Sequence, residues 1–170
     1  MGKAIILTVA MLLLATTVTA EPDSARNYVL SVLESRKVTE AVLYFVELDP
    51  VQGSSETYLL LYPDYECRVS FSGQTATTFN SAVMNLETQP VDTSPSAYSG
   101  IRLLDRTGRT LLMIFLSRKF NGAQSVLGSI AGSTVRMNLA LQDWLDVHFP
   151  HGRMPRSFCV RRNSAAPALQ

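Results

Sequence analysis

The spacing of hydrophobic residues along the chain predicts a mixture of helices and strands. After Ser24, apolar residues recur every three or four positions, which predicts a helix that begins at Asp23 or Ser24 and ends near Arg36 and Lys37. Cations suit the carboxyl end of a helix because they oppose its dipole. The following segment, 40–48, is rich in β-branched and aromatic residues and apolar on both faces, so it predicts a central strand.

The next part of the chain predicts two more strands and a helix. Segments 57–62 and 65–71 are strand-like in composition, and turn residues separate them from each other and from the strand before. Together with 40–48 they predict an antiparallel meander. Apolar positions within 73–87 have helical spacing, although the threonines of this segment weaken the pattern.

The remaining sequence predicts a surface loop, a hairpin and a closing helix. Segment 89–100 has the composition of a loop, and segments 101–105 and 110–117 flank a turn, which predicts a hairpin whose second strand is central. Segment 125–133 fits either a loop or a short helix. A helical stripe of apolar residues across 134–148 predicts the last helix, which a proline then ends.

Together these elements predict a single α+β domain over residues 21–162. Their order is α-β-β-β-α-β-β-α, and strands joined by short turns favour an antiparallel sheet over a parallel one. We expect a sheet of about five strands with helices packed mainly on one face. Residues 163–170 are predicted to form a disordered tail.

Residues 1–20 have the pattern of a secretory signal peptide. Lys3 precedes an apolar run from Ala4 to Ala15, and small residues follow it up to Ala20. The strongly apolar part is shorter than the about 20 residues that a membrane-spanning helix needs. We therefore expect cleavage near Ala20, export to the periplasm or the extracellular medium, and no membrane association after cleavage.

The domain contains two cysteines, Cys67 and Cys159. In an exported protein an isolated pair of cysteines most often forms a disulfide, and we predict this bond here. It would attach the segment after the last helix to the strand 65–71. The alternative is a reactive thiol, which needs an activating base nearby, and only His148 and His151 could serve.

Charge is distributed unevenly along the chain, although the formal net charge is only +1. Residues 21–66 include nine acidic and three basic residues, whereas the part from Arg102 onward has ten basic and three acidic residues. Two interpretations are open: the two parts neutralise each other in the folded domain, or each forms a separate surface that steers a charged partner. The basic residues lack a base-stacking motif, so a nucleic-acid partner is not predicted.

Motifs for nucleotide binding and for common hydrolases are absent from the sequence. The chain has no G-x-G-x-x-G, no Gly-Lys-Ser/Thr loop and no G-x-S-x-G. Paired carboxylates for glycoside cleavage are conceivable at Asp64 and Glu66 or at Glu47 and Asp49, because each pair would share one face of a strand. Exposed strand faces often bear such acids, so we predict no catalytic residue.

The end of the closing helix contains residue types that can bind a metal ion. Asp143, Asp146, His148 and His151 all belong to the types that bind zinc. Their spacing is poor and a proline separates the two histidines, so we expect a solvated helix end and neither a metal nor a cofactor. Trp144, within the same stretch, is predicted to anchor the helix in the core.

These observations favour an exported, non-catalytic binding protein that recognises another protein, for instance as an inhibitor or an immunity-type protein. A carrier of a small apolar ligand and a hydrolase without a familiar motif are the alternatives. Contacts are expected in the loop 89–100 and in the acidic stretch around 47–56, because loops on a rigid scaffold often serve recognition. The predicted contact residues are Glu47, Asp49, Glu56, Asp92 and Tyr98.

Overall fold

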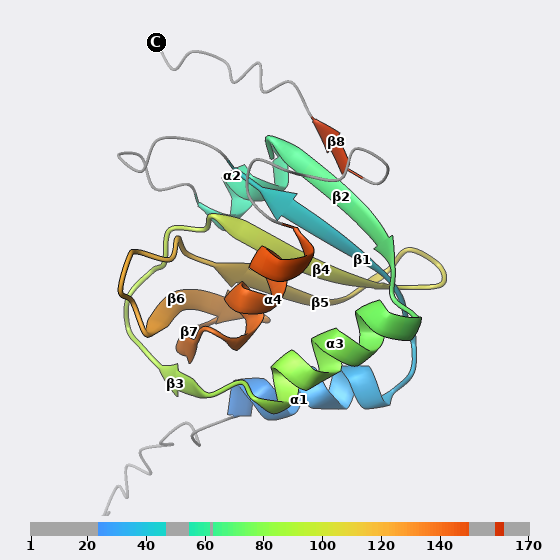
Figure 1. Cartoon of the computed structure of the whole chain (residues 1–170), viewed down its shortest axis with the longest axis horizontal. Coiled ribbons are helices and arrows are strands. Elements are labelled where there is room, and N and C mark those ends of the chain that lie inside the picture. Colours follow the sequence, from blue (N-terminus) through green and yellow to red (C-terminus); the bar gives the residue numbers. More distant parts are fainter. Residues whose placement is uncertain (1–23, 47–54, 62, 150–158, 162–170) are drawn as a thin grey trace, which may run out of the picture.

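The computed structural model of the protein describes residues 24–46, 55–61, 63–149 and 159–161. In these ranges the chain forms an eight-stranded antiparallel sheet and four helices, which confirms the α+β class but not the predicted size of about five strands (Figure 1). The strands follow one another across the sheet as β3 (Thr88–Pro90), β7 (Ser133–Asn138), β6 (Ser125–Ile130), β5 (Thr110–Leu116), β4 (Ser99–Asp105), β1 (Val38–Phe45), β2 (Tyr65–Ser70) and β8 (Cys159–Arg161). The helices are α1 (Ser24–Glu34), α2 (Glu56–Leu61), α3 (Gly73–Met84) and α4 (Ala140–His148).

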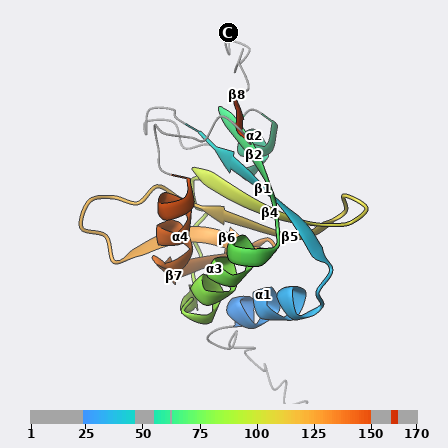
Figure 2. The same ribbon diagram turned by 45° about the vertical axis from the view of Figure 1, so that its right-hand side comes forward.

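Strand β1 lies between β2 and β4, and its side chains alternate between the two faces of the sheet. Leu43 belongs to the large apolar core under helices α1, α3 and α4, which cover one face (Figures 1 and 2). Val42 and Tyr44 belong to a smaller cluster on the opposite face, with Leu59 of α2. Because both faces are buried along this strand, its sequence is apolar at successive positions. We call the side of the sheet that presents Val42 and Tyr44 the second face.

Aromatic residues join helices α3 and α4 on the helical face. The Trp144 and Phe79 rings meet edge to face, with 5.0 Å between their centroids. The indole N–H of Trp144 donates a hydrogen bond to the hydroxyl oxygen of Thr78 at 3.0 Å, so the ring is buried without losing its polar partner. This arrangement confirms that Trp144 anchors the closing helix in the core.

A disulfide joins Cys67 to Cys159, as the sequence predicted. Cys67 is fully buried on β2, and Cys159 is the first residue of β8, which pairs with β2 in antiparallel register. The bond therefore attaches the short edge strand β8 to the sheet. A disulfide fits an oxidising compartment.

The segment 57–62 was predicted to be a strand, and this prediction is wrong, because residues 56–61 form helix α2. The leucines of this segment are good helix formers, and Glu56 in the first turn opposes the helix dipole. Leu59 is fully buried on the second face. Its Cδ2 atom would lie only 3.3 Å from a Cβ at Gly100, so the glycine of β4 makes room for the helix. The predicted three-strand meander is lost with this strand.

The segment 125–138 forms the hairpin β6–β7, whereas the sequence predicted a loop or short helix and then the start of the last helix. Two residues, Ala131 and Gly132, connect the strands with φ angles of 51° and 84°. Positive φ at both positions gives the turn a twist that matches paired strands. The closing helix, predicted over 134–148, begins at Ala140, and Met137, which also fits the helical stripe, is buried on β7.

The segment 89–100 is not one surface loop as predicted. Its first residues belong to β3, and its last two, Ser99 and Gly100, begin β4 and are buried. Ala97 is also buried, in the cluster of the second face. The segment thus crosses from one edge of the sheet to its middle, because β3 and β4 are separated by three other strands.

The remaining predictions divide into confirmed elements and elements that the structure does not describe. The first helix, the central strand, the cysteine strand, the helix in 73–87 and the hairpin around the turn 106–109 are confirmed. The predicted signal peptide (1–20) and the predicted tail (163–170) lie outside the described residues. Among the helices that are described, none is long and apolar enough to span a membrane.

Candidate functional site

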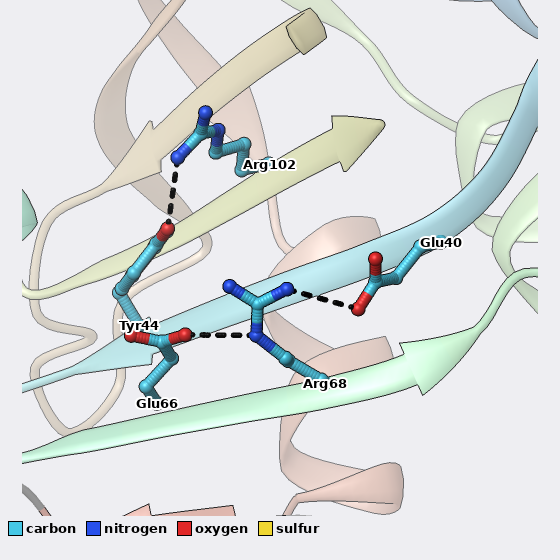
Figure 3. A network of polar contacts seen from close by, with 5 residues as sticks. All are labelled: Glu40, Tyr44, Glu66, Arg68 and Arg102. Atoms are coloured by element: carbon cyan, nitrogen blue, oxygen red, sulfur yellow. Dashed lines mark hydrogen bonds and ion pairs between the residues drawn. The ribbon is translucent and has the colours of Figure 1, made fainter. Parts of the chain in front are cut away.

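The second face presents a network of charged residues on the adjacent strands β1 and β2. The Arg68 guanidinium donates from Nε to Glu66 at 3.0 Å and from Nη1 to Glu40 at 3.3 Å (Figure 3). Burial of the guanidinium opposes its charge, but the hydrogen bonds and charges of Glu66 and Glu40 together outweigh this and raise the pKa of Arg68. The Arg68 side chain is nevertheless 57% exposed, so it is fixed in place and still open to solvent.

Arg102 on β4 lies on the same face, with Val42 between it and Arg68 in the strand register. Its Nε donates to the Thr110 hydroxyl at 2.8 Å. Its Nη1 donates to the Tyr44 hydroxyl at 3.4 Å (Figure 3). Within the described part of the chain, the hydrogen-bond acceptors of this guanidinium are therefore neutral hydroxyl groups. A carboxylate would be a stronger acceptor for it than either hydroxyl.

The structure also bears on the uneven distribution of charge along the sequence. Of four ion pairs between described residues, none joins the acidic part 21–66 to the basic part from Arg102 onward. Two acids of the first part are paired with Arg68, which follows that part, and two cations of the last part are paired with its own aspartates. The four pairs are Arg68–Glu40, Arg68–Glu66, Arg109–Asp105 and Lys119–Asp143.

The three predicted contact residues that the structure describes lie in different parts of the fold. Glu56 begins α2 on the second face, where its carboxylate accepts a hydrogen bond from the buried Ser129 hydroxyl of β6. Tyr98 lies near the middle of the sheet, since its backbone bonds to Val46 and Leu116, and the Arg118 guanidinium lies over its ring. Asp92 is exposed just after β3 at the sheet edge, and the other two predicted residues, Glu47 and Asp49, lie outside the described residues.

The residues considered for a metal site have other partners in the structure. The Asp143 carboxylate accepts from the Lys119 ammonium at 2.9 Å, and Asp146 accepts from the Gln142 amide at 2.9 Å. The His148 ring packs against Trp144 at 5.2 Å between centroids, and His151 lies outside the described residues. No group of three or more His, Cys, Asp or Glu side chains within the described ranges is placed to hold a metal ion.

The carboxylate pair considered for glycoside cleavage also has a different arrangement from the one predicted. Asp64 precedes β2 and is not part of the strand, and Glu66 is 8% exposed and accepts a hydrogen bond from Arg68. The Glu66 carboxylate is thereby used to hold an arginine side chain. The second pair, Glu47 and Asp49, lies outside the described residues.

Sequence reasoning did not single out Tyr44, Arg68 and Arg102 as functional residues. Opposite charges at Glu66 and Arg68 share one strand face, and Arg102 interrupts an apolar strand; both are visible in the sequence. What the sequence does not show is that β4 lies next to β1, which brings the two arginines to the same face.

Comparisons with known proteins assign no family to the chain. A scan against protein-family models finds no match, and neither the curated proteins nor the solved structures include one that matches the chain.

Proposed function

We propose that this protein is an exported, non-catalytic binding protein that recognises another protein through the second face of its sheet. The observation that supports the proposal most is the pair of ordered arginines on that face, Arg68 and Arg102, the second of which is held by the hydroxyl of the buried Tyr44 (Figure 3). Arginine is among the residue types that most often dominate the energy of protein interfaces.

The way these side chains are held supports a role in binding. Two carboxylates fix the Arg68 guanidinium, and two hydroxyls fix that of Arg102. Ordering a long side chain upon binding costs about 0.5–1.5 kcal/mol, so side chains that are already ordered lose less on association. The strands beneath them are stapled further by the disulfide at the β2–β8 edge.

The carboxylates of this face support a binding role more than a catalytic one. Glu66 and Glu40 share one arginine, and Glu56 is bonded to Ser129. Each acid thereby positions a neighbouring side chain or element. Such a face offers a partner fixed hydrogen-bond donors, which support a specific protein interface.

Site-specific photocrosslinking in cells that make the protein tests this proposal. A photoreactive side chain is placed at Ser70 or Thr110, both exposed on the second face, and at Asn80, exposed on α3, as a control. We expect a discrete adduct with one protein at the two second-face positions and none at Asn80. Adducts of equal yield at Asn80, or no adduct at any position above an uncrosslinked background, would contradict the proposal.

A further inference from the structure

Several basic residues from distant parts of the sequence meet at one end of the sheet. Val38, the first residue of β1, pairs with Asp105, the last residue of β4. The start of β1 and the β4–β5 turn therefore lie side by side, as both views show (Figures 1 and 2). We call this region the basic end; it consists of Arg36, Lys37, Arg106 and Arg109.

The cations of the basic end are exposed and largely without anionic partners. Arg36, Lys37 and Arg106 are exposed, and their side chains make no hydrogen bond or ion pair with any other described residue. Arg109, whose side chain is 72% exposed, is paired with Asp105 at 3.5 Å. The Asp105 carboxylate is already used within its own turn, where it accepts from the backbone and hydroxyl of Thr107.

The strand register brings two of these cations to the same end of the sheet. Because Val38 pairs with Asp105, Lys37 directly precedes β1 and Arg106 directly follows β4 at that end. Neighbouring like charges raise the local positive potential. A carboxylate bound there would be attracted by both.

Backbone strain at Arg36 points in the same direction. Its φ angle is 53°, in the left-handed region that glycine adopts without penalty at the end of a helix. The chain thus has a strained cation at a position where glycine would be unstrained. Strained residues of this kind cluster at functional sites.

We infer that the protein partner presents an acidic surface and that the basic end binds its carboxylates. The inference rests on the proposed function, since it names the chemistry of that partner. Arg102 connects the two surfaces, because its side chain reaches along the second face to Thr110 at the start of β5. Three of the four cations of the basic end are arginines, whose planar guanidinium matches a carboxylate with two parallel hydrogen bonds.

A protein surface fits this end better than a continuous polyanion. Asp105 and Glu40 lie near the cations, and each is paired with an arginine. A chain of evenly spaced phosphates or sulfates would meet these carboxylates and be repelled by them, whereas a folded partner can place its acids opposite the arginines alone.

Titration with a labelled peptide that has a few glutamates separated by neutral residues tests the inference, with a heparin fragment and anionic phospholipid vesicles as competing probes. The test variant is Lys37→Glu with Arg106→Glu, and the control variant is Arg118→Glu with Arg136→Glu, which changes the net charge equally at other exposed positions. We expect the wild type to bind the peptide with an affinity that falls with salt, and the test variant to bind about tenfold more weakly or worse. The control variant should stay within about threefold of the wild type.

Arg36→Gly provides a second variant that does not reverse a charge. It removes one cation and relieves the positive φ angle, so it should bind the peptide more weakly while unfolding at a higher urea concentration. NMR shifts caused by the peptide should concentrate at 36–38 and 102–110. Equal losses in the test and control variants, or binding of heparin or vesicles through the basic end without binding of the peptide, would overturn the inference.

The two proposals fail in different ways. If the photocrosslinked adduct at Thr110 persists in the Lys37→Glu, Arg106→Glu variant, the partner does not use the basic end. Only the inference of an acidic partner surface is then refuted. If the wild type gives no adduct at any position, the proposed function is refuted, whether or not the peptide binds.

Discussion

Cys67 on β2 lies directly opposite Cys159 on β8, and the disulfide between them closes a separation of 92 residues in the sequence. Strand β8 pairs with β2 at three positions only, from Tyr65 to Cys67. Three ladder pairs are a small contact for an edge strand. The covalent bond is therefore the main restraint described here that keeps β8 on the sheet.

Replacing both cysteines, Cys67→Ala with Cys159→Ala, should lower the free energy of unfolding. Cross-linking a loop of this length restricts the unfolded chain, and such bonds contribute about 2–4 kcal/mol in most proteins. We expect a loss in that range in urea denaturation, together with faster hydrogen exchange in β8. A reducing agent should destabilise the wild type similarly and leave the double variant unchanged; an unaffected wild type would refute the role of the bond.

Gly128 on β6 should be intolerant of any side chain. A Cβ at this position would meet the backbone carbonyl oxygen of Phe115 on β5 and would lie 2.8 Å from Cε of Met137. Because a backbone atom cannot move aside without shifting the β5–β6 pairing, we expect Gly128→Ala to cost about 1–3 kcal/mol of unfolding free energy. Urea denaturation measures this loss.

Gly100→Ala is the matched control for that substitution. Its Cβ would lie 3.3 Å from side-chain atoms of Leu59 and Phe115, which can adjust by a few tenths of an ångström. The loss at Gly100 should therefore be the smaller of the two. Equal losses at both glycines would show that the close backbone approach at Gly128 does not decide the outcome.

Much of the fold could be predicted because it depends on local pattern. The helix after Ser24 and the strand from Val38 have strong periodicity or β-branched composition, and only one pairing of Cys67 and Cys159 is possible. The hairpin at 106–109 combines two apolar segments with a turn that contains Gly108, whose φ of 81° few other residues adopt.

The elements that were missed depend on contacts between distant residues. The leucines of 57–61 suit a strand or a helix, and what selects the helix is packing of Leu59 against the space left by Gly100, 41 positions later. The turn at 131–132 has alanine where asparagine is the usual signal for a hairpin. Met137 fits the helical stripe of the following helix equally well, so periodicity extended that helix too far.

The candidate site was missed for the same reason. Export and protein recognition remain predictions, but the expected contact loop spans separate places in the structure, and two of the predicted acids are not described. The basic end arises from the register of Val38 with Asp105, which brings Lys37 and Arg106 to the same end of the sheet. No periodicity in the sequence encodes that register; it follows from how β1 and β4 pack in the sheet.

Thr78→Val should destabilise the protein by leaving the buried indole of Trp144 without its acceptor. The Thr78 hydroxyl accepts the indole N–H at 3.0 Å, and Trp144 is 6% exposed. An unsatisfied buried donor costs about 1–3 kcal/mol. The chain has a single tryptophan, so its fluorescence during urea denaturation reports on this site directly.

Thr77→Val, one position earlier in α3, is the control for that change. Thr77 is exposed and its hydroxyl donates only to the helical carbonyl of Gly73, so its loss should be small. Thr78→Ser, which keeps the hydroxyl, should retain most of the stability. If Thr77→Val and Thr78→Val unfold at the same urea concentration, the indole hydrogen bond does not stabilise the fold.

The pH dependence of the free energy of unfolding should show how much the Asp105 carboxylate stabilises the fold. The hydrogen bond from the Thr107 hydroxyl lowers the pKa of Asp105, although partial burial opposes the charge. Hydrogen bonds from the backbone N–H groups of Arg109 and Thr107, together with the Arg109 charge, lower this pKa further. A carboxyl whose pKa is lower in the folded state stabilises that state fully above its ordinary pKa of about 3.9. This contribution is lost as the pH falls through the lowered folded-state value.

Asp105→Asn should therefore unfold at a lower urea concentration than the wild type at pH 7, and the difference should shrink as the pH falls below the ordinary aspartate range. Above that range the difference should be constant, because the carboxylate is ionised in both the folded and the unfolded chain. Asp143→Asn, which removes an exposed partner of Lys119, should show a smaller difference that salt abolishes. A difference for Asp105→Asn that persists unchanged into strong acid would mean that the side chain acts through its shape and not through its charge.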